Sequence, residues 1–453
     1  MEETVQANAP NEYSVTVIGA GLAGSEAAYY LATRGIPVRL IEMKPHKKTP
    51  AHSGDGFGEL VCSNSLKSDD KYANACGLLK EEMRILGSLT MEAAEYARVP
   101  AGAALAVDRE KFSQYITDKI RALPNVEIVE EEVLSVPMPE KDGGRYVIIA
   151  TGPLTADALS EDIQRLTGGS LHFFDASAPI VSADSVDMEK AFTGDRYGKG
   201  TGDYINCPMS KEEYYTFVDE LLAAERAHLH EFEKREIFEG CMPIEVMASR
   251  GRDTLRYGTL KPVGLYDEDG VRPYAVLQLR KETASGETYN LVGCQTNLKF
   301  PEQKRVFSLI PALRNAEYLR YGVMHRNTYL NSPGFLNPDY SVKKDDRLFF
   351  AGQMTGVEGY VESSSSGFVA GVNAAMKALG REAVIFPKET EIGALAHYVS
   401  EGGISSSFQP MNANFGIIAP FDKKIKGGKK ARNEAYGVRS LEIIKTINIF
   451  NET

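Results

Sequence analysis

Residues 13–42 read YSVTVIGAGLAGSEAAYYLATRGIPVRLIE, and this stretch decides the fold of the N-terminal part of the chain. A β-branched run ending at Ile18 leads into a glycine-rich turn, and an Ala-rich helical segment follows. Gly35 ends that helix, a second apolar strand comes next, and Glu42 closes the stretch. A strand, a GxGxxG turn, a helix and an acidic residue in this order are typical of a dinucleotide-binding βαβ unit.

Three glycines of the turn have separate physical roles. Gly19 permits the tight turn, Gly21 lets the backbone approach a pyrophosphate, and Gly24 lets the helix pack closely on the strand. The helix N-terminus offers unpaired N–H groups to the anion, and the Glu42 carboxylate can accept a hydrogen bond from a ribose 2′-hydroxyl. A purely structural glycine turn is the alternative. The predicted cofactor-binding residues here are Gly19, Ala20, Gly21, Leu22, Ala23, Gly24 and Glu42.

A second strand–turn–helix segment lies far downstream, in DDRLFFAGQMTGVEGYVESSSSGFVAGVNAAMKAL at 345–379. A small-residue helix is predicted there from about Ser364. This segment and the turn at Ala150-Thr151-Gly152 favour FAD over NAD as the resident cofactor, because FAD is long and usually needs contacts from both ends of a chain. The residues of the second segment predicted to bind it are Gly352, Gln353, Thr355 and Gly356.

The order of these segments predicts an α/β fold, with a discontinuous Rossmann-like FAD-binding domain and an inserted α+β domain. A chain of 453 residues exceeds what one hydrophobic core usually holds. The predicted parts are 1–180 and 321–453 for the FAD-binding domain and 181–320 for the insertion. Within the insertion we expect a hairpin, AVLQLRKE and ETYNLVGCQT joined by ASGE, and a charged helix over 211–235.

The composition limits the classes of function. With 43% hydrophobic and 25% charged residues the chain is ordinary for a globular protein, and no apolar run is long enough for a membrane span. Five scattered cysteines and a polar first segment without a secretory signal indicate a reducing, cytoplasmic location with no membrane partner. The net charge of −11 argues against nucleic-acid binding over the whole surface and permits a local basic patch.

Two cysteines lie in polar contexts that suit a reactive thiol. Cys62 is part of ELVCSNSLK, and Cys241 is part of FEGCMPIE. A reactive thiolate needs partial exposure and nearby positive charge, for which Lys67 and Arg250 or Arg252 are candidates. The alternative for each cysteine is a small buried hydrophobic residue. No cysteine pair has the spacing of zinc ligands, so no metal site is predicted.

Two further groups of residues are candidate binding sites. Six cations within ten residues near the C-terminus suit phosphate contacts, although a solvated linker is the alternative. His325, Arg326 and Asn327 follow a strand-like segment and could line a pocket for a heteroaromatic ligand, whereas a histidine satisfied in the core is the alternative. The cationic residues near the C-terminus are Lys423, Lys424, Lys426, Lys429, Lys430 and Arg432.

Taken together, these segments closely resemble the folate-dependent tRNA (uracil-5-)-methyltransferase family of flavoproteins, over nearly the whole chain. The most specific blocks are ELVCSNSLKS (59–68) and MPIEVMASRG (242–251). The blocks AGQMTGVEGYVES (351–363) and FQPMNANFG (408–416) add to them. Two departures stand out: Ser364-Ser365 replaces the usual Ala-Ala, and QTNLKF (295–300) replaces QTHLKW, which removes a His and a Trp.

The resemblance implies that methylenetetrahydrofolate donates a one-carbon unit to C5 of the T-loop uridine of tRNA. Reduced FAD would supply hydride and NAD(P)H would recharge the flavin. The family's two functional cysteines map onto Cys62 and Cys241, and we expect Cys241 to attack C6 of the base while Cys62 assists near the flavin. His325, Arg326 and Asn327 are expected in the folate pocket, and the basic C-terminal residues are expected to bind RNA. No obligatory protein partner is expected.

Other functions fit part of the pattern. The same chemistry could act on a ribosomal RNA uridine, or the chain could be one of the related flavoproteins that modify the tRNA wobble uridine. A flavin- and RNA-binding protein without catalysis is a third possibility, but the intact blocks around Cys62 and Cys241 argue against it. A plain NADH oxidase would leave the basic C-terminal segment unexplained.

Overall fold

A computed structural model of the protein describes residues 14–49, 51–139, 146–168, 170–198, 200–227, 242–267, 269–282, 285–402, 408–423, 425–447 and 449. For 170–176 and 324–328 it describes the backbone only. Two predicted site residues, Cys241 and Lys424, therefore lie outside the described residues.

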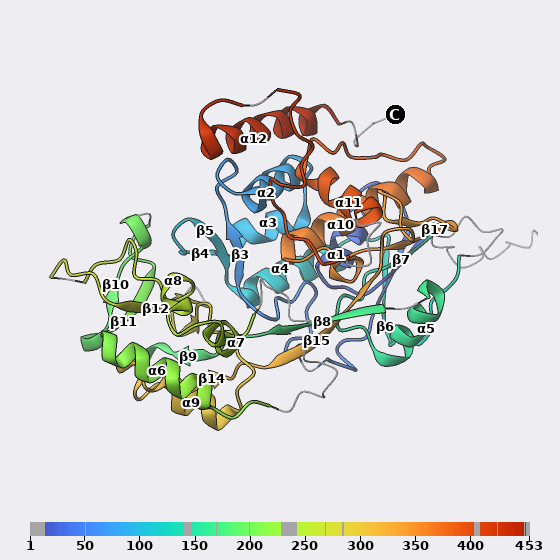
Figure 1. Ribbon diagram of the computed structural model, residues 1–453. Coiled ribbons are helices and arrows are strands. Elements are labelled where there is room, and N and C mark those ends of the chain that lie inside the picture. The colour runs from blue at the N-terminus through green and yellow to red at the C-terminus, as the bar shows by residue number, and fades with distance from the viewer. Residues whose placement is uncertain are drawn as a thin grey trace, which may run out of the picture.

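A mostly parallel sheet carries the N-terminal motif near its centre (Figure 1). Its strand order is β16–β17–β7–β1–β2–β6, and within this sheet only the β16–β17 pair is antiparallel. Strands β1 and β2 are buried at all but one position each, as expected for a sheet covered on both faces. The predicted return of the downstream chain is confirmed, because β17 pairs in parallel with β7. The bounds are β1 Val15–Ile18, β2 Val38–Glu42, β6 Val126–Glu130, β7 Tyr146–Ile149, β16 Ser341–Val342 and β17 Asp345–Phe350.

Small residues let the helices α1 (Leu22–Ala32) and α10 (Tyr360–Ala378) pack closely. A Cβ built on Gly367 would lie 2.1 Å from the carbonyl oxygen of Ala23, so no larger residue fits there without backbone movement. Helix α10 begins at Tyr360, about one turn before the predicted start at Ser364. The other helices of this part are α2 Ala75–Ile85, α3 Leu89–Tyr96, α4 Arg109–Arg121, α5 Asp157–Thr167, α11 Glu391–Glu401 and α12 Gly428–Thr446.

The middle of the chain forms a second sheet, antiparallel throughout its described strands, at the lower left of Figure 1. Its order is β10–β11–β12–β13–β9–β14. The predicted hairpin is confirmed, because β12 and β13 are antiparallel neighbours. The bounds are β9 Ile180–Ser182, β10 Phe192–Thr193, β11 Tyr204–Met209, β12 Ala275–Lys281, β13 Thr288–Leu291, β14 Tyr318–Arg320, α6 Lys211–Ala223, α7 Ile244–Ser249, α8 Thr254–Tyr257 and α9 Phe300–Phe307.

Helix α6 begins with a capping box made by Ser210 and Glu213. The prediction that it continues to residue 235 is wrong over residues 224–227, and 228–235 lie outside the described residues. The helix ends because Ala224 is extended and the next residues pair with another segment: the Lys299 N–H donates to the carbonyl of Glu225.

Two short sheets lie alongside these. Strands β8 (Ser170–Ala176) and β15 (Met324–Leu330) form an antiparallel pair that runs between the two large sheets in Figure 1. The other short sheet, β3–β5–β4, consists of Ser65–Ser68, Ala104–Val107 and Arg98–Val99. None of the described helices is both long and apolar enough to cross a membrane.

Each large sheet has its own apolar core. One cluster draws residues from 15–163 and 330–449, and the other draws them from 181–316. The predicted class is confirmed: the parallel sheet is built from both ends of the chain, and a mixed α and β unit is inserted between its halves. The limits at 180 and 320 stay predictions.

Candidate functional site

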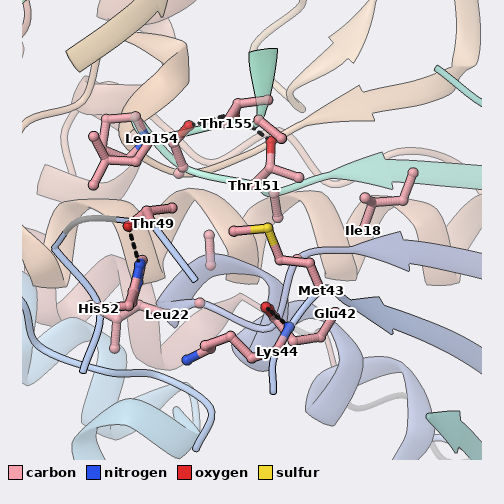
Figure 2. A pocket seen from close by; sticks show the side chains of 18 of the residues that line it. Ile18, Leu22, Glu42, Met43, Lys44, Thr49, His52, Thr151, Leu154 and Thr155 are labelled. Atoms are coloured by element: carbon pink, nitrogen blue, oxygen red, sulfur yellow. Dashed lines mark hydrogen bonds between the residues drawn. The ribbon is translucent and has the colours of Figure 1, made fainter. Parts of the chain in front are cut away.

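A pocket opens where β1, β2 and β7 of the parallel sheet end (Figure 2). The N-terminal glycine turn, Glu42 and the turn after β7 contribute to its wall, and so do Gly352 and Gln353 from the downstream segment. Parallel sheets bind ligands at the carboxyl ends of their strands, which is where this pocket lies.

The glycine turn leaves one side of the pocket without side chains. Gly19 has φ 95°, and a Cβ on it would lie 2.6 Å from the carbonyl oxygen of Ala150. A Cβ on Gly24 would lie 1.8 Å from the carbonyl oxygen of Gly19, whereas one on Gly21 would meet no atom within 4 Å. Gly19, Gly21, Leu22 and Ala23 line the pocket, whereas the predicted residues Ala20 and Gly24 do not. Close packing therefore requires Gly24, and open space surrounds Gly21.

The N-terminus of α1 suits an anion. No side chain caps it, its first turn contains no acidic residue, and Gly21 is its N-cap. The first N–H groups of a helix have no partner within the helix and carry the positive end of its dipole. A pyrophosphate next to Gly21 can accept hydrogen bonds from them.

Glu42 lies at the end of β2 and faces the pocket. It is 7% exposed, and its carboxylate accepts hydrogen bonds from the N–H of Ala20 (2.7 Å) and the N–H of Lys44 (3.0 Å). Each carboxylate oxygen keeps capacity for a further donor. This arrangement is compatible with the predicted contact to a ribose hydroxyl, which stays a prediction.

In the downstream glycine-rich segment, too, some of the predicted residues line the pocket and others do not. Gly352 and Gln353 line the pocket, whereas the predicted residues Thr355 and Gly356 do not. The Thr355 hydroxyl donates to the carbonyl of Gly352 (2.8 Å). Gly356 has φ 94°, and a Cβ there would lie 2.4 Å from a ring atom of Phe408. Thr355 and Gly356 therefore shape the turn that presents Gly352 and Gln353.

Several wall residues were not predicted from the sequence. Figure 2 shows Thr151 and Thr155 on one side of the pocket and Lys44 and His52 on the other. The hydroxyls of Thr151 and Thr155 are 2.7 Å apart, and His52 Nδ1 lies 2.6 Å from the Thr49 hydroxyl. Burial, and then the positive charge of Lys44, lower the pKa of His52, so its imidazole is neutral near pH 7. The sequence signal noted above for this wall was the Ala-Thr-Gly turn, which contains Thr151.

Cys62 lies at the edge of the pocket. It is half-buried, and its Sγ is 3.0 Å from the Tyr360 hydroxyl. Tyr360 and Val61 are part of the pocket wall. The same hydroxyl accepts hydrogen bonds from the N–H groups of Cys62 (2.9 Å) and Ser63 (3.0 Å). Burial, and then the negative charge of a Cys62 thiolate, raise the pKa of Tyr360 well above its usual value, so the phenol keeps a proton that it can donate to sulfur.

Three arginines hold the loop that carries Cys62. Arg109 donates to the carbonyl of Leu60 (3.1 Å), and Arg320 donates to the carbonyl of Val61 (3.2 Å). Arg280 donates to the Ser63 hydroxyl (2.8 Å). Arg280 and Arg320 come from the inserted sheet and Arg109 from helix α4, so elements of both large units fix this loop.

Two of the three cations suggested by sequence proximity are seen in ion pairs with carboxylates. Lys67 Nζ lies 3.5 Å from a carboxylate oxygen of Glu362, and Arg252 forms an ion pair with Asp219. Positive charge reaches the Cys62 loop through residues distant in sequence.

The other described cysteines have different surroundings. Cys207 and Cys294 are fully buried, and burial raises the pKa of both thiols far above the usual range. Cys76 is half-buried, and burial raises its pKa as well. Among the described cysteines, Cys62 is the one beside the pocket. The part of the chain that the structure describes contains no cluster of three metal-ligating side chains.

The remaining predicted residues lie on β15 and near the C-terminus. His325, Arg326 and Asn327 belong to β15, opposite Asp175, Phe174 and Phe173 of β8, and their side chains are outside the description. Near the C-terminus the side chains of Lys423, Lys426, Lys429, Lys430 and Arg432 are exposed, and none is in an ion pair with another described residue. The last three belong to the first turns of α12, which Figure 1 shows at the edge of the molecule beyond α2 and α11.

Comparisons with known proteins agree with this geometry. Residues 14–382 match the family model described as glucose inhibited division protein A. The chain is 58% identical over 433 residues to the methylenetetrahydrofolate–tRNA-(uracil-5-)-methyltransferase TrmFO of Acetivibrio thermocellus, covering 95% of this chain and 98% of that protein. It is 57% identical over 438 residues to the protein of the same name from Listeria welshimeri, covering 96% and 99%. Among solved structures, Aquifex aeolicus GidA is similar, with a TM-score of 0.70 and 17% identity over 97% of this chain and 77% of that one, which supports the fold.

Proposed function

The chain belongs to the family of methylenetetrahydrofolate–tRNA-(uracil-5-)-methyltransferases, and we propose that it transfers a one-carbon unit from methylenetetrahydrofolate to C5 of the T-loop uridine in tRNA. The observation that carries the proposal is the position of Cys62, a half-buried thiol at the edge of a dinucleotide-type pocket and within hydrogen-bond distance of a tyrosine of its wall. A simple oxidase has no need of such a thiol.

FAD fits the residues that form the pocket. Open space surrounds Gly21, and the uncapped N-terminus of α1 can receive a pyrophosphate. We assign the ribose to Glu42 and the flavin end to Gly352 and Gln353, close to the N-terminus of α10. When bound and reduced, FAD supplies the hydride for the one-carbon unit, and NAD(P)H restores the reduced state.

The protein's part in the chemistry is to activate the base. C5 of uracil is a poor nucleophile until a group adds at C6, and a cysteine thiolate can add there. In our proposal Cys241 forms the S–C6 bond, the C5–C6 electron pair moves toward the C4 carbonyl oxygen, and C5 then attacks the folate methylene. Loss of the C5 proton to a base would then expel tetrahydrofolate by breaking the bond between its nitrogen and the transferred methylene. The methylene left on C5 would take up one hydride, for which reduced FAD is the source, and departure of the Cys241 thiolate would break the S–C6 bond and leave the methyl group.

The contacts of Cys62 suit a supporting role near the flavin. The neutral Tyr360 can donate a hydrogen bond to its sulfur, and Arg109, Arg280 and Arg320 fix the loop on both sides of it. A thiol held in one orientation beside the pocket can assist or protect the reactive carbon without itself bonding to the base.

RNA binding is assigned to the surface outside the pocket. The target uridine must leave its stack to reach the flavin, which costs a few kcal/mol. Exposed lysines at the start of α12 can recover part of this free energy through phosphate contacts. We further propose that the inserted unit, 181–320, faces the RNA, and that the enzyme works in the reducing cytoplasm, where free thiols persist.

The direct test is incubation of the purified yellow protein with a tRNA transcript, methylenetetrahydrofolate and NAD(P)H, followed by nucleoside analysis. We expect ribothymidine in the T-loop, and none when folate is omitted. Methyl transfer from S-adenosylmethionine would overturn the proposal. The same assay with a ribosomal RNA fragment is the comparison. Ribothymidine in that fragment but not in tRNA would support ribosomal RNA as the target.

Cysteine variants test the division of labour. Cys241→Ser is expected to abolish the covalent protein–RNA adduct, whereas Cys62→Ser is expected to form the adduct and to fail in methyl transfer. An adduct that survives in Cys241→Ser but not in Cys62→Ser reverses the two assignments.

A further inference from the structure

Three aromatic rings form a ladder on the inserted unit. Tyr321 is the middle ring: it stacks on Phe300 with ring centroids 4.9 Å apart and an interplanar angle of 13°. Its other partner is Tyr318, at 5.5 Å and 5°. Phe300 forms the outer end of the ladder and is 50% exposed. Near-parallel rings at these distances are offset-stacked, an ordinary arrangement of aromatic pairs. What suits a stacking platform is that this stack ends in an exposed ring, on which a further flat ring can stack.

The ladder lies next to the loop of Cys62. Tyr318 belongs to β14, and Arg320 of the same strand donates to the carbonyl of Val61, the residue before Cys62. Phe300 is the first residue of α9. The ladder and the pocket edge are thus joined through one short strand.

The ladder also lies near the described ends of the segment that contains Cys241. The N–H of Ala227 donates to the carbonyl of Asn297 (2.8 Å), and the N–H of Ile244 donates to the carbonyl of Gln295 (2.7 Å). Residues 295–297 lie three to five positions before Phe300 in the sequence. The described residues on either side of 228–241 therefore lie beside 295–297, close to the start of α9.

The charge around the ladder suits a polyanion. Lys304 lies one helical turn from Phe300, on the same side of α9, and Arg226 forms a β-bridge with Leu298. Both side chains are exposed, and neither is in an ion pair with another described residue. The acids Glu225 and Glu302 are neutralised by Lys299 and Arg305.

We propose that Phe300, backed by Tyr321 and Tyr318, is the platform on which a base of the RNA stacks while the target uridine is in the pocket. The inference rests on the proposed function, because it takes RNA as the substrate. Stacking of a base on an aromatic ring is tolerant of sequence, and Lys304 and Arg226 can contact the phosphates of the stacked nucleotide. Phe300 is then a substrate-positioning residue and not a catalytic one.

The absence of tryptophan from the sequence makes a specific probe available. Phe300→Trp introduces a single tryptophan into the holoenzyme, and its emission can be excited where tyrosine does not absorb. We expect quenching that saturates as tRNA is added, with no change when methylenetetrahydrofolate is added alone. Tyr96→Trp is the control, because Tyr96 is also exposed and rests on another ring, that of Tyr115, but lies on α3 of the other unit.

Kinetics give the second readout. Phe300→Ala is expected to raise the KM for tRNA about 10- to 100-fold, the loss that removal of one stacked base produces, with flavin content and the KM for folate unchanged. Phe300→Trp should restore the KM. Lys304→Gln should lower the salt dependence of tRNA binding by about one unit of slope.

Four results would overturn the inference. These are no quenching of Phe300→Trp, equal quenching of Tyr96→Trp, quenching by folate alone, and an unchanged KM for tRNA in Phe300→Ala. Each leaves the proposed function standing as long as the wild-type enzyme makes ribothymidine from folate. If the wild-type enzyme fails in that assay, the proposed function fails first.

Discussion

The parallel sheet and the inserted sheet share one way of accommodating polar groups and differ in where they keep thiols and exposed rings. Around the parallel sheet, buried carboxylates bind backbone N–H groups of neighbouring elements: Glu26 accepts from Leu89 and Thr90 at the start of α3. The inserted sheet has an apolar interior that includes the thiols of Cys207 and Cys294, and its aromatic ladder lies at the surface. Glu245 of the inserted unit is also fully buried and accepts from the N–H of Asn297 (2.8 Å), so the buried thiols and the ladder are what set the inserted unit apart.

The largest expected effect tests backbone placement in the glycine turn. Gly24→Ala would bring a Cβ to 1.8 Å from the Gly19 carbonyl oxygen, so the backbone must move. We expect a loss of about 3 kcal/mol or more in the free energy of unfolding, at the upper end of overpacking effects, and loss of flavin. Denaturant titration and the flavin absorbance of the purified protein measure both quantities.

Gly21→Ala is the matched control for the same turn. Its φ of −70° suits alanine and no atom lies within 4 Å of the new Cβ, so the apoprotein should unfold like the wild type. Because Gly21 lines the pocket, we expect the flavin content to fall. Equal stability of the two variants would contradict the distinction between packing and ligand contact.

The next effect concerns a buried carboxylate that joins three helices. Glu82 of α2 accepts from the N–H groups of Glu391 and Ile392 in α11 and from the Ser440 hydroxyl in α12. Burial raises its pKa to about 7, so the folded state binds a proton more tightly than the unfolded state. Its contribution to stability is therefore complete below the unfolded pKa and decreases as the pH rises through about 7.

Glu82→Gln should remove this pH dependence. The wild-type free energy of unfolding is expected to fall by an amount on the order of 3 kcal/mol between about pH 4.5 and pH 8, and the variant should show a flatter profile. Glu434→Gln, at an exposed position of α12, is the control and should follow the wild type. A Glu82→Gln profile with the wild-type slope would assign the pH dependence to other groups.

A smaller effect is expected in the apolar interior of the inserted sheet. Cys207 is completely buried, and burial is the one cause of its raised thiol pKa, which indicates apolar surroundings. A serine hydroxyl placed there would lose its hydrogen bonds to water, so we expect Cys207→Ser to lower the free energy of unfolding by about 2 kcal/mol. Activity per folded molecule should be retained. The comparison is Cys62→Ser, which should lose methyl transfer with little change in stability because Cys62 is half-buried. The reverse pattern would place the functional thiol inside the inserted sheet.

The sequence was sufficient for the glycine turn because its structure is local. Gly19, Gly21, Gly24 and Glu42 lie within one βαβ unit, and each position has a backbone or ligand requirement that depends on near neighbours. The same reasoning located Gly352 and Gln353. It did not distinguish residues that face the pocket from Thr355 and Gly356, which shape the turn, because that distinction depends on the packing of Phe408.

The surroundings of Cys62 could not be derived from the sequence. Tyr360 bonds to it across 298 positions, and Arg280 reaches Ser63 across 217. Such contacts depend on how the two units pack against each other, and this packing cannot be inferred from sequence periodicity or from a local motif. Lys67, the nearby cation in the sequence, pairs with Glu362, and its influence on the Cys62 thiol stays a prediction.

The structure shows what surrounds the residues at two positions where the sequence departs from the family pattern, Ser364 and Phe300. Ser364 is buried and its hydroxyl lies 2.9 Å from Glu26 and 2.6 Å from Thr90, so the replacement of alanine adds hydrogen bonds that a sequence comparison does not show. Phe300, at the position of the usual tryptophan, is the outer ring of the ladder.

The smallest expected effect is on the salt dependence of tRNA binding. It tests whether the phosphates are contacted by lysines of α12 or by Lys304 of the inserted unit. Lys429 and Lys430 are exposed in the first turn of α12, where the helix dipole also favours an anion. If they contact phosphates, each lysine-to-glutamine substitution should lower the slope of log Kd for tRNA against log salt by about one, with flavin content unchanged. Lys445→Gln, at the exposed C-terminal end of the same helix, is the control and should leave the slope unchanged. Loss of slope in Lys304→Gln but not in Lys429→Gln or Lys430→Gln would assign the phosphate contacts to the inserted unit alone, and α12 would then serve only to cover α2.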